Sequence, residues 1–372
     1  MDKTSKQLRE IGIFSTANLI PIKVADSDSL VDIFIDLKRY KQREWNSSGG
    51  LVPISFADGA NEIDAVSAII EWRDRAFLNS PKQFSMKLLA GFTIDTSFVA
   101  SRLRYDASLS TNWFLGIRFP TKIIGYYEKF IFGKKTDFPE GIDRFGANLA
   151  QRVQLMGRSY FETRTIWERF SDRSEENIEE RSISLKINID RKDDPLFTKK
   201  GYLLQGLIKK AGFDGSRDYF KTDVTLQSYY SLSKGPVCAM RIQYGRLWQW
   251  SQTYEDYSFE KFYLGGSTSM RGWQVLKFSV NEQGEPNGGI TRLMANFELR
   301  QHVYKSFGMT LFSDGGFLSD EPSNYNLIGK MRWDVGLGLT FETPLGPARF
   351  DYAIQIDDHN KQQFNIGVQN LF

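Results

Sequence analysis

Along most of the chain, hydrophobic and polar residues alternate in runs of roughly 10 to 14 residues, and polar turns separate the runs. The alternation is clearest over residues 84–95, 182–190, 333–342 and 348–357. In the third run, for example, Val335 and Leu337 alternate with Asp334 and Gly336. Because successive side chains of a strand point to opposite faces, each run predicts a β-strand with one apolar and one polar face. The pattern therefore predicts an all-β fold.

Alternation alone fits a soluble sandwich with its apolar faces inside or a membrane barrel with its apolar face outside. The connections favour the barrel, because short turns alternate along the chain with longer polar loops. The short turns are 233–236 and 344–347, and the long loops are 253–288 and 315–328. At roughly 20 residues per strand and turn, we expect a 16-stranded antiparallel transmembrane β-barrel over residues 42–372. Residues 123–132 fit either a strand or a loop.

Residues 1–41 have a different pattern. Residues 4–12 predict the end of an amphipathic helix, and residues 29–41 predict a strand with alternating apolar positions from Val31 to Leu37. Two such elements cannot close a hydrophobic core, so we expect a remnant of an α/β module whose other strands precede it. The start of the chain also lacks the basic and apolar regions of a secretory signal, which suggests a fragment of a longer precursor.

Composition excludes several functional classes. The net charge of +3 is close to balance and the basic residues are scattered, so we expect no nucleic-acid partner. Cys238 is the single cysteine, and His302 and His359 are the only histidines, so the sequence predicts neither a disulfide nor a Cys/His metal site. No run of 18 apolar residues occurs, which excludes a helical membrane span.

The sequence also lacks the signatures of common enzymes. There is no Gly-x-Ser-x-Gly nucleophile turn and no phosphate-binding Gly-x-x-x-x-Gly-Lys-Ser/Thr loop. The paired carboxylates Asp193 and Asp194 lie in a predicted turn, where solvated turn residues are the simpler interpretation. We therefore predict that the protein is not an enzyme and that it needs no cofactor. The many aromatic residues fit the interfacial girdles of a barrel.

The loop before residue 290 contains the most specific motif. Residues 265–273 read Gly-Gly-Ser-Thr-Ser-Met-Arg-Gly-Trp, with one arginine, Arg271, among small residues and a tryptophan. An arginine in a confined polar space needs carboxylate partners. Alternation places Asp314 and Glu298 on the inward faces of their strands, so we expect Arg271 to fold into the lumen and pair with both. The pair could simply fix the loop, or it could take part in the working cycle.

The two strands that would close the barrel are both weak. The first strand, near residues 43–56, contains Gly49, Gly50 and Pro53, and the last, residues 362–372, contains Gly367. We expect few hydrogen bonds between them, and hence a seam that can open sideways and expose a strand edge. The alternative is that these residues only shape a barrel corner. The last strand ends in Phe372, which we expect to anchor it at the lipid interface.

Four motifs occur in the order found in one family. In chain order they are the turn Arg191–Pro195 with Asp193, Asp194 and Pro195, the loop residues Gly265-Gly266 with Met270-Arg271-Gly272-Trp273, the strand residues Phe312-Ser313-Asp314-Gly315-Gly316, and the turn Thr343–Pro347. With these motifs the chain resembles the carboxy-terminal part of the BamA/TamA superfamily, the bacterial surface antigen barrels, preceded by a remnant of a POTRA domain. It departs from the family in Met270, Trp273 and one inserted residue in the 191–195 turn.

The resemblance implies an outer-membrane insertase that helps β-barrel proteins fold through a weak lateral seam, with its amino terminus in the periplasm. It implies outer-membrane lipid, unfolded β-barrel clients, and periplasmic chaperones or accessory lipoproteins as partners, and no cofactor. The alternatives are a two-partner-secretion translocator or the barrel module of a secreted phospholipase. A passive channel without a client is the third possibility.

Overall fold

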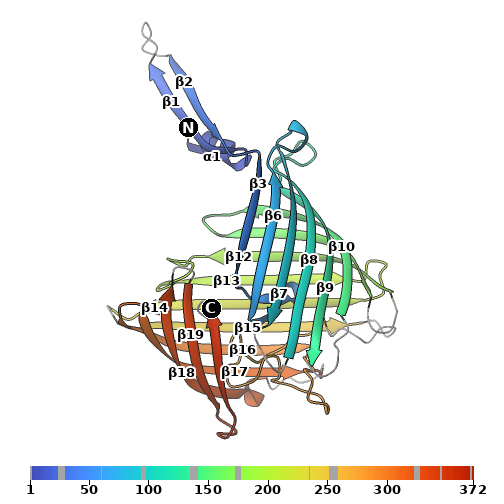
Figure 1. Cartoon of the computed structure of the whole chain (residues 1–372), viewed down its shortest axis with the longest axis vertical. Coiled ribbons are helices and arrows are strands. Elements are labelled where there is room, and N and C mark those ends of the chain that lie inside the picture. The colour runs from blue at the N-terminus through green and yellow to red at the C-terminus, as the bar shows by residue number, and fades with distance from the viewer. Residues whose placement is uncertain are drawn as a thin grey trace.

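The chain forms one large curved sheet with a small helix-and-hairpin unit at its amino-terminal end (Figure 1). The structure is a computed structural model. It describes residues 2–23, 30–59, 61–93, 98–134, 141–171, 177–233, 235–250, 259–321, 327–343, 346–368 and 371–372.

The large sheet has 16 strands in sequence order, and each strand is antiparallel to its neighbours. The strands are β3 (Arg43–Leu51), β6 (Ala65–Asp74), β7 (Lys82–Thr93), β8 (Phe98–Thr111), β9 (Thr121–Lys134), β10 (Gly141–Gln154), β11 (Tyr160–Ser171), β12 (Asn177–Asp190), β13 (Gly201–Ala211), β14 (Tyr219–Ser231), β15 (Val237–Gln249), β16 (Thr291–Tyr304), β17 (Phe307–Ser319), β18 (Arg332–Thr343), β19 (Gly346–Gln355) and β20 (Gln362–Val368). The prediction of sixteen antiparallel strands is confirmed, and residues 123–132 belong to strand β9.

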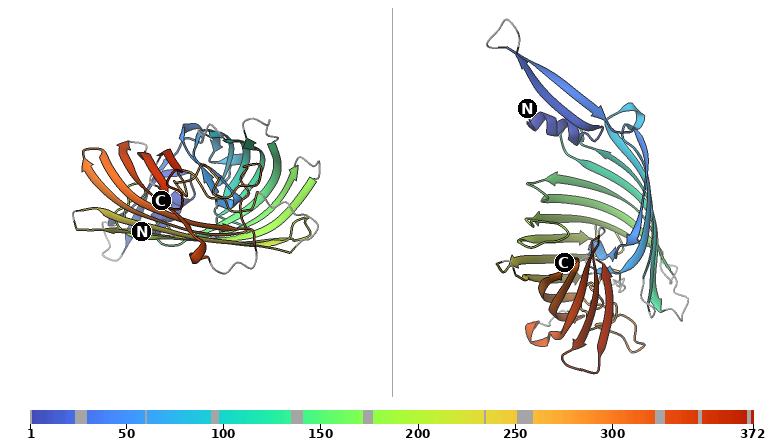
Figure 2. Two further views of the ribbon diagram at one scale, coloured as in Figure 1. Left: turned by 90° about the horizontal axis from the view of Figure 1, so that it is seen from below. Right: turned by 60° about the vertical axis from the view of Figure 1, so that its left-hand side comes forward.

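The sheet curves into a trough but does not close (Figure 2). Among the described residues, β3 and β20 lie at its two ends and are not paired with each other. The expected closed barrel is therefore not what the structure shows. One physical reason is that the chain turns inward at both ends of the sheet: an inner hairpin follows Leu51, and the carbonyl oxygens of Leu371 and Phe372 bind Arg241 and Arg300 of the inner wall.

The two faces of the sheet have opposite character. On β18, Leu337 is 56% exposed on the outer face, while Asp334 on the inner face is fully buried. The same inversion recurs around the sheet, with large apolar side chains outside and charged ones inside. An outer surface this apolar needs a nonaqueous environment. Within the described ranges, no helix is both long and apolar enough to cross a membrane.

The amino-terminal unit consists of α1 (Asp2–Glu10) and a hairpin of β1 (Phe14–Lys23) and β2 (Val31–Arg39). It projects from the sheet beside the start of β3 (Figure 1). The sequence predicted the helix and the second strand but missed β1. Ile33 and Ile35 of β2 are about half exposed, so the hairpin presents an apolar face that the described part of the chain does not cover. The assignment of residues 1–41 to a POTRA domain stays a prediction.

After β3 the chain leaves the sheet and enters the trough. There β4 (Ile54–Phe56) and β5 (Asn61–Ile63) pair as a small hairpin, and the 3-10 turn η1 (Ala57–Gly59) follows β4. The first strand therefore ends at Leu51 and not near residue 56 as expected. Pro53, which has no N–H to donate to a ladder, lies just beyond the strand end.

Several connections differ from the expected ones. The loop expected over residues 315–328 starts later, because β17 continues to Ser319, and η3 (Ile328–Lys330) precedes β18. Lys234 in the turn 233–236 and residues 344–345 in the turn 343–347 lie outside the described residues. Residues 253–258 of the long loop 253–288 also lie outside them.

Candidate functional site

The loop between β15 and β16 folds back into the trough. In its described part, from residue 259 onward, Phe262, Leu264 and Met270 are almost completely buried. Gly265 and Gly266 begin a tight turn, in which the Gly266 N–H is shared between the carbonyl oxygens of Met270 (3.1 Å) and Trp273 (3.0 Å). This turn presents Arg271 to the inner wall of the sheet.

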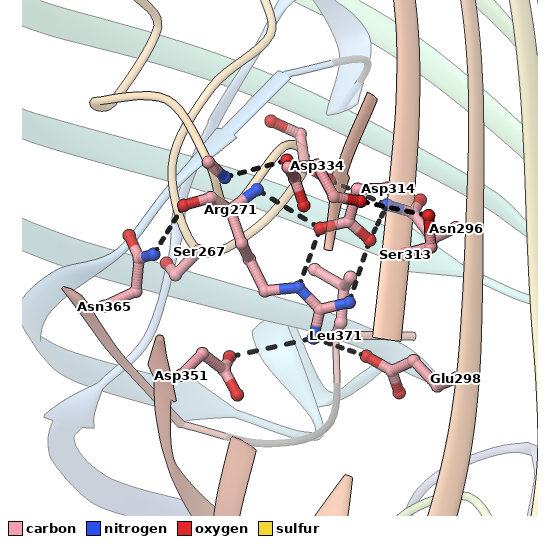
Figure 3. A network of polar contacts seen from close by, with 12 residues as sticks. Ser267, Arg271, Asn296, Glu298, Ser313, Asp314, Asp334, Asp351, Asn365 and Leu371 are labelled. Atoms are coloured by element: carbon pink, nitrogen blue, oxygen red, sulfur yellow. Dashed lines mark hydrogen bonds and ion pairs between the residues drawn. The ribbon is translucent and has the colours of Figure 1, made fainter. Parts of the chain in front are cut away.

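Arg271 is fully buried and lies between two carboxylates (Figure 3). Its Nε and Nη2 atoms each donate to one oxygen of Asp314 at 2.8 Å, and its Nη1 atom donates to Glu298 Oε1 at 2.7 Å. This two-pronged geometry is the strong form of a charge-assisted hydrogen bond. The structure thus brings together the three charged residues that the sequence singled out.

The residues next to these groups fix the position of the arginine. The guanidinium carbon lies 3.4 Å from the centre of the ring of Phe312, which shares the inner face of β17 with Asp314. The Gly272 N–H donates to Asp334 Oδ2 at 2.8 Å. A Cβ atom at Gly272 would lie 2.6 Å from Cβ of Asp334, so only glycine allows this approach.

An apolar cluster holds the rest of the motif. Met270 and Trp273 pack with Phe278 and other buried side chains, and the Trp273 and Phe278 ring centres are 4.9 Å apart. Gly316 of β17 lies against Met270. The loop motif is therefore held by charge on one side and by apolar packing on the other.

The charged network is larger than the sequence predicted. It contains four arginines and four carboxylates, namely Arg241, Arg271, Arg300, Arg349, Glu298, Asp314, Asp334 and Asp351. Asn296 connects parts of it, because its Nδ2 atom donates to Asp314 Oδ1 and to the Ser269 carbonyl oxygen, both at 2.8 Å. Alternation had placed Asp314 and Glu298 on inward faces, but it gave no sign of which other residues join them at the loop.

A second anchor of the loop was missed entirely. Glu260 is buried between two lysines, with Lys209 Nζ at 3.1 Å and Lys221 Nζ at 2.9 Å. Lys209 also pairs with Asp58 of the inner hairpin at 3.1 Å and with Glu180 of β12 at 3.0 Å. The inward positions of Lys209 on β13 and Lys221 on β14 were the only available sequence signal.

The glycines expected at the seam lie on the two end strands and differ in what surrounds them. Gly49 and Gly50 lie in β3 and keep their register with β6, opposite Ala68 and Ser67, so they do not interrupt that ladder. Gly367 lies in β20 opposite Arg349. A Cβ atom there would lie 2.6 Å from Arg349 Nη2, so the glycine makes room for the guanidinium.

Phe372 is not at the lipid interface, contrary to the expectation. Arg300 Nη2 donates to its carbonyl oxygen at 3.1 Å, Arg241 Nη1 donates to that of Leu371 at 3.0 Å, and the Phe372 ring lies 6.1 Å from the ring of Tyr229. These contacts place it inside the trough. The reason lies in the register, because Val368 pairs with Ala348 and β19 begins at Gly346, which leaves no β19 partner for residues 371–372.

Asp193, Asp194 and Pro195 lie in the turn between β12 and β13, far along the chain from the loop. The Asp194 carboxylate accepts hydrogen bonds from the backbone N–H groups of Phe197 (2.7 Å) and Leu196 (2.8 Å). These bonds lower the pKa of Asp194 below its ordinary value of 3.8. The arrangement is a self-stabilised turn.

The fold and the site together define a class of protein. Its antiparallel sheet has an apolar outer face, and a long loop lies in the trough of the sheet, where a buried arginine holds it. The model of the Omp85 superfamily domain matches residues 71–372, so the chain belongs to the Omp85 superfamily. The match begins within β6, after β3 and the inner hairpin.

Two curated relatives extend this result. The chain is 29% identical over 148 residues to the outer membrane protein assembly factor BamA of Nitratidesulfovibrio vulgaris, over 39% of this chain and 19% of the relative. It is 24% identical over 204 residues to a SAM50-like protein of Schizosaccharomyces pombe, over 50% of this chain and 43% of the relative. The matches thus span less than half the length of either relative.

Solved structures show the same fold. The crystal structure of BamA from Haemophilus ducreyi lacking POTRA domains 1–3 matches with a TM-score of 0.72 and 15% identity, over 98% of this chain and 76% of that one. CdiB from Acinetobacter baumannii matches with a TM-score of 0.55 and 11% identity, over 100% of this chain and 68% of that one. The predicted family resemblance is confirmed at the level of the superfamily.

Proposed function

We propose that the protein is an outer-membrane assembly factor that helps β-barrel proteins fold into the membrane, without a cofactor or covalent chemistry. One observation carries the proposal: the end strands β3 and β20 are not paired with each other in the described residues. A free strand edge offers unpaired N–H and C=O groups, which can template an incoming strand by β-augmentation. The assembly-factor names of the BamA relatives support this function.

The orientation follows from the connections. Strict antiparallel order puts alternate connections on opposite rims of the sheet, and the long loop between β15 and β16 lies on the rim opposite residues 1–41. In an outer-membrane barrel the short turns face the periplasm. We therefore place the amino terminus, as a remnant of a POTRA domain, in the periplasm. There it would meet unfolded clients, chaperones or accessory lipoproteins.

The locked loop would serve the working cycle by holding the inner wall in one arrangement. A buried ion pair is weak evidence for stability, and in some proteins its role is to specify one geometry. A network of matched charges that joins one loop to strands β16, β17 and β19 fits that role. Arg271 would thus act as a positioning residue for the seam, and not as a reacting group.

A translocator of the two-partner-secretion type, or the barrel module of a phospholipase, is supported less well. The fold likeness to CdiB is weaker than that to BamA. The loop also lies in the path that a polypeptide or an ion would take through the trough. Beside it is a polar cavity of about 310 Å³, lined by Arg241, Gln243 and Arg292 among others.

Reconstitution tests the proposed function. The chain, with Cys238→Ser and with cysteines at the exposed positions Ser47 in β3 and Ile366 in β20, is placed in lipid vesicles with an unfolded β-barrel client. We expect faster client folding, measured by the heat-dependent gel migration of folded barrels. A bis-thiol crosslinker that joins the two edges should abolish the acceleration, and the uncrosslinked protein is its matched control.

Three outcomes would count against the assignment. Equal client folding with and without the crosslink would exclude the seam as the working site. Transport of a secreted polypeptide into the vesicles, without client folding, would indicate the translocator. Ion conductance without either effect would indicate a passive channel.

A further inference from the structure

The long loop is bonded to the elements at both free edges of the sheet. We infer that it is a bridge across the open seam, with Asn61 as the positioning residue on the β3 side and Asn365 as that on the β20 side. The inference concerns how the two edges are held and does not rest on the proposed function.

On the β3 side, the contact is made by the inner hairpin that follows Leu51. Asn61 is 3% exposed and pairs with the loop backbone in both directions. Its Nδ2 atom donates to the Lys261 carbonyl oxygen at 2.9 Å, and its Oδ1 atom accepts from the Tyr263 N–H at 2.9 Å. One buried side chain thus makes two hydrogen bonds to the loop backbone, and its loss would remove both of them.

Apolar and charged contacts strengthen the same junction. The Phe56 ring lies 6.0 Å from the ring of Phe259 and 5.8 Å from that of Tyr263. Lys209 Nζ is 3.1 Å from a carboxylate oxygen of Asp58 on the hairpin and 3.1 Å from one of Glu260 on the loop. The hairpin and the loop therefore share both a core and a counterion.

On the other side, the loop is bonded to the last two strands. Asn365 Nδ2 in β20 donates to the Arg271 carbonyl oxygen at 2.8 Å (Figure 3). Gln355 Nε2 in β19 donates to the Gly272 carbonyl oxygen at 2.7 Å. These bonds tie β19 and β20 to the segment that the Arg271 network locks.

Ser267 touches both sides at once. Its hydroxyl donates to the carboxylate of Asp64, which lies just before β6, and its carbonyl oxygen accepts from Arg349 Nη2 of β19 at 3.1 Å. Thr268 adds a bond from its hydroxyl to the Glu62 carbonyl oxygen at 2.7 Å. The two edges are therefore connected in series through the lumen, although β3 and β20 do not pair directly in the described residues.

A connection in series makes a distinctive prediction. Breaking the bridge at either end should release the two edges from each other. Breaking it at both ends should change the distance between the edges no more than the more harmful of the two single breaks. The distance between the edges is measured in membrane-reconstituted full chain by pulsed spin-label spectroscopy, with labels on cysteines at Ser47 and Ile366 in the Cys238→Ser background. The unmodified seam should give one narrow distance distribution.

Asn61→Ala and Asn365→Ala should each broaden that distribution and lengthen its mean distance by at least one strand spacing, which is about 4.8 Å. The double variant should give the same shift as the larger single one. Asn18→Ala, on the exposed face of β1, is the matched control and should change nothing.

An unchanged distribution in Asn61→Ala, or a shift of equal size in Asn18→Ala, would overturn the bridge. Fully additive shifts would also overturn it, because they would mean that the two sides are held independently. If Asn61→Ala fails to fold by circular dichroism, Ser267→Ala takes its place, since it removes only the hydroxyl bond to Asp64. No shift in that variant would equally reject the inference.

Discussion

The loop inside the sheet has two charged anchors of opposite sign. At one, an arginine of the loop enters a group of carboxylates on β16 and β17; at the other, Glu260 of the loop enters a pair of lysines on β13 and β14. The planar guanidinium forms two parallel bonds to Asp314 and stacks on Phe312. The lysines are point charges and impose no such orientation. The first anchor therefore fixes the orientation of the loop, and the second fixes mainly its depth.

The anchors also differ in how many partners the strand residues keep when the loop residue is removed. Without Glu260, Lys209 still has Asp58 and Glu180 within 3.1 Å. Without Arg271, the bidentate partner of Asp314 is gone, and Asn296, a neutral group, is what remains bonded to Oδ1. The arginine anchor should therefore be the more costly one to break.

The largest effect is expected from Arg271→Ala. Removing one partner of a buried pair typically costs about 3–5 kcal/mol, because it leaves uncompensated buried charge. The chain should still insert, but the loop should become protease-sensitive and client folding should fall at least about tenfold. Limited proteolysis of intact vesicles and the client assay measure the two effects.

Arg271→Lys keeps the charge but not the two-pronged geometry, and should be intermediate. Unchanged protease resistance with full activity in the alanine variant would remove Arg271 from the mechanism. Equal behaviour of the lysine variant and the original protein would show that charge alone matters, and the contrast between the two anchors would disappear.

Glu260→Gln should have a smaller effect. It keeps the size and one hydrogen-bond acceptor, and we expect a loss on the order of 1–3 kcal/mol from the weakened lysine contacts. Proteolysis should show cleavage near residues 259–264 before cleavage near Arg271. If the loss matches that of Arg271→Ala, the two anchors are equivalent and the comparison fails.

A third prediction concerns the shape of the arginine anchor. In Gly272→Ala, the new Cβ atom would lie 2.6 Å from Cβ of Asp334, and such overpacking typically costs about 1–3 kcal/mol. Gly125→Ala in β9 is the matched control, because no atom lies within 4 Å of its added Cβ. Denaturant titration of both variants measures the difference, and equal stabilities would contradict the tight fit.

The sequence could predict the arginine anchor but not the lysine anchor, for a physical reason. Alternation indicated which residues of several strands face inward, including Asp314 and Glu298, and the small residues around Arg271 indicated a confined loop. No such motif surrounds Glu260, and nothing in the sequence distinguishes its partners Lys209 and Lys221 from other inward-facing lysines. Which inward residues meet depends on how the loop folds in space, and alternation carries no information about that.

The ends of the sheet show the same limit. The count and order of the strands followed from local alternation and connection lengths, which are properties of neighbouring residues. The turn of residues 52–64 into the trough depends on contacts with Lys261 and Tyr263, about 200 positions away. The inward position of Phe372 likewise depends on Arg300 and on the end of β19. Such contacts form only when distant strands come together.

The smallest expected effect is that of acid on the exposed turn at Asp194 and on the Glu260 anchor. The backbone N–H groups of Phe197 and Leu196 lower the pKa of Asp194, so its stabilising effect is present above the ordinary value of 3.8 and is lost as the pH falls through the lowered value. Burial alone would raise the pKa of Glu260, but Lys209 and Lys221 lower it below its ordinary 4.5, so this anchor also keeps its charge at pH 4.5.

Between pH 7 and pH 4.5, proteolysis at the turn and at the loop should both stay unchanged. As the pH falls from 3.8 through the lowered pKa of Asp194, the turn of the original protein should open. Asp194→Asn should show a smaller change there, because Asp193 is then the remaining ionisable carboxylate of this pair. Loop cleavage that begins above pH 4.5 would show that Glu260 is protonated early and that the lysine anchor is weaker than its geometry indicates.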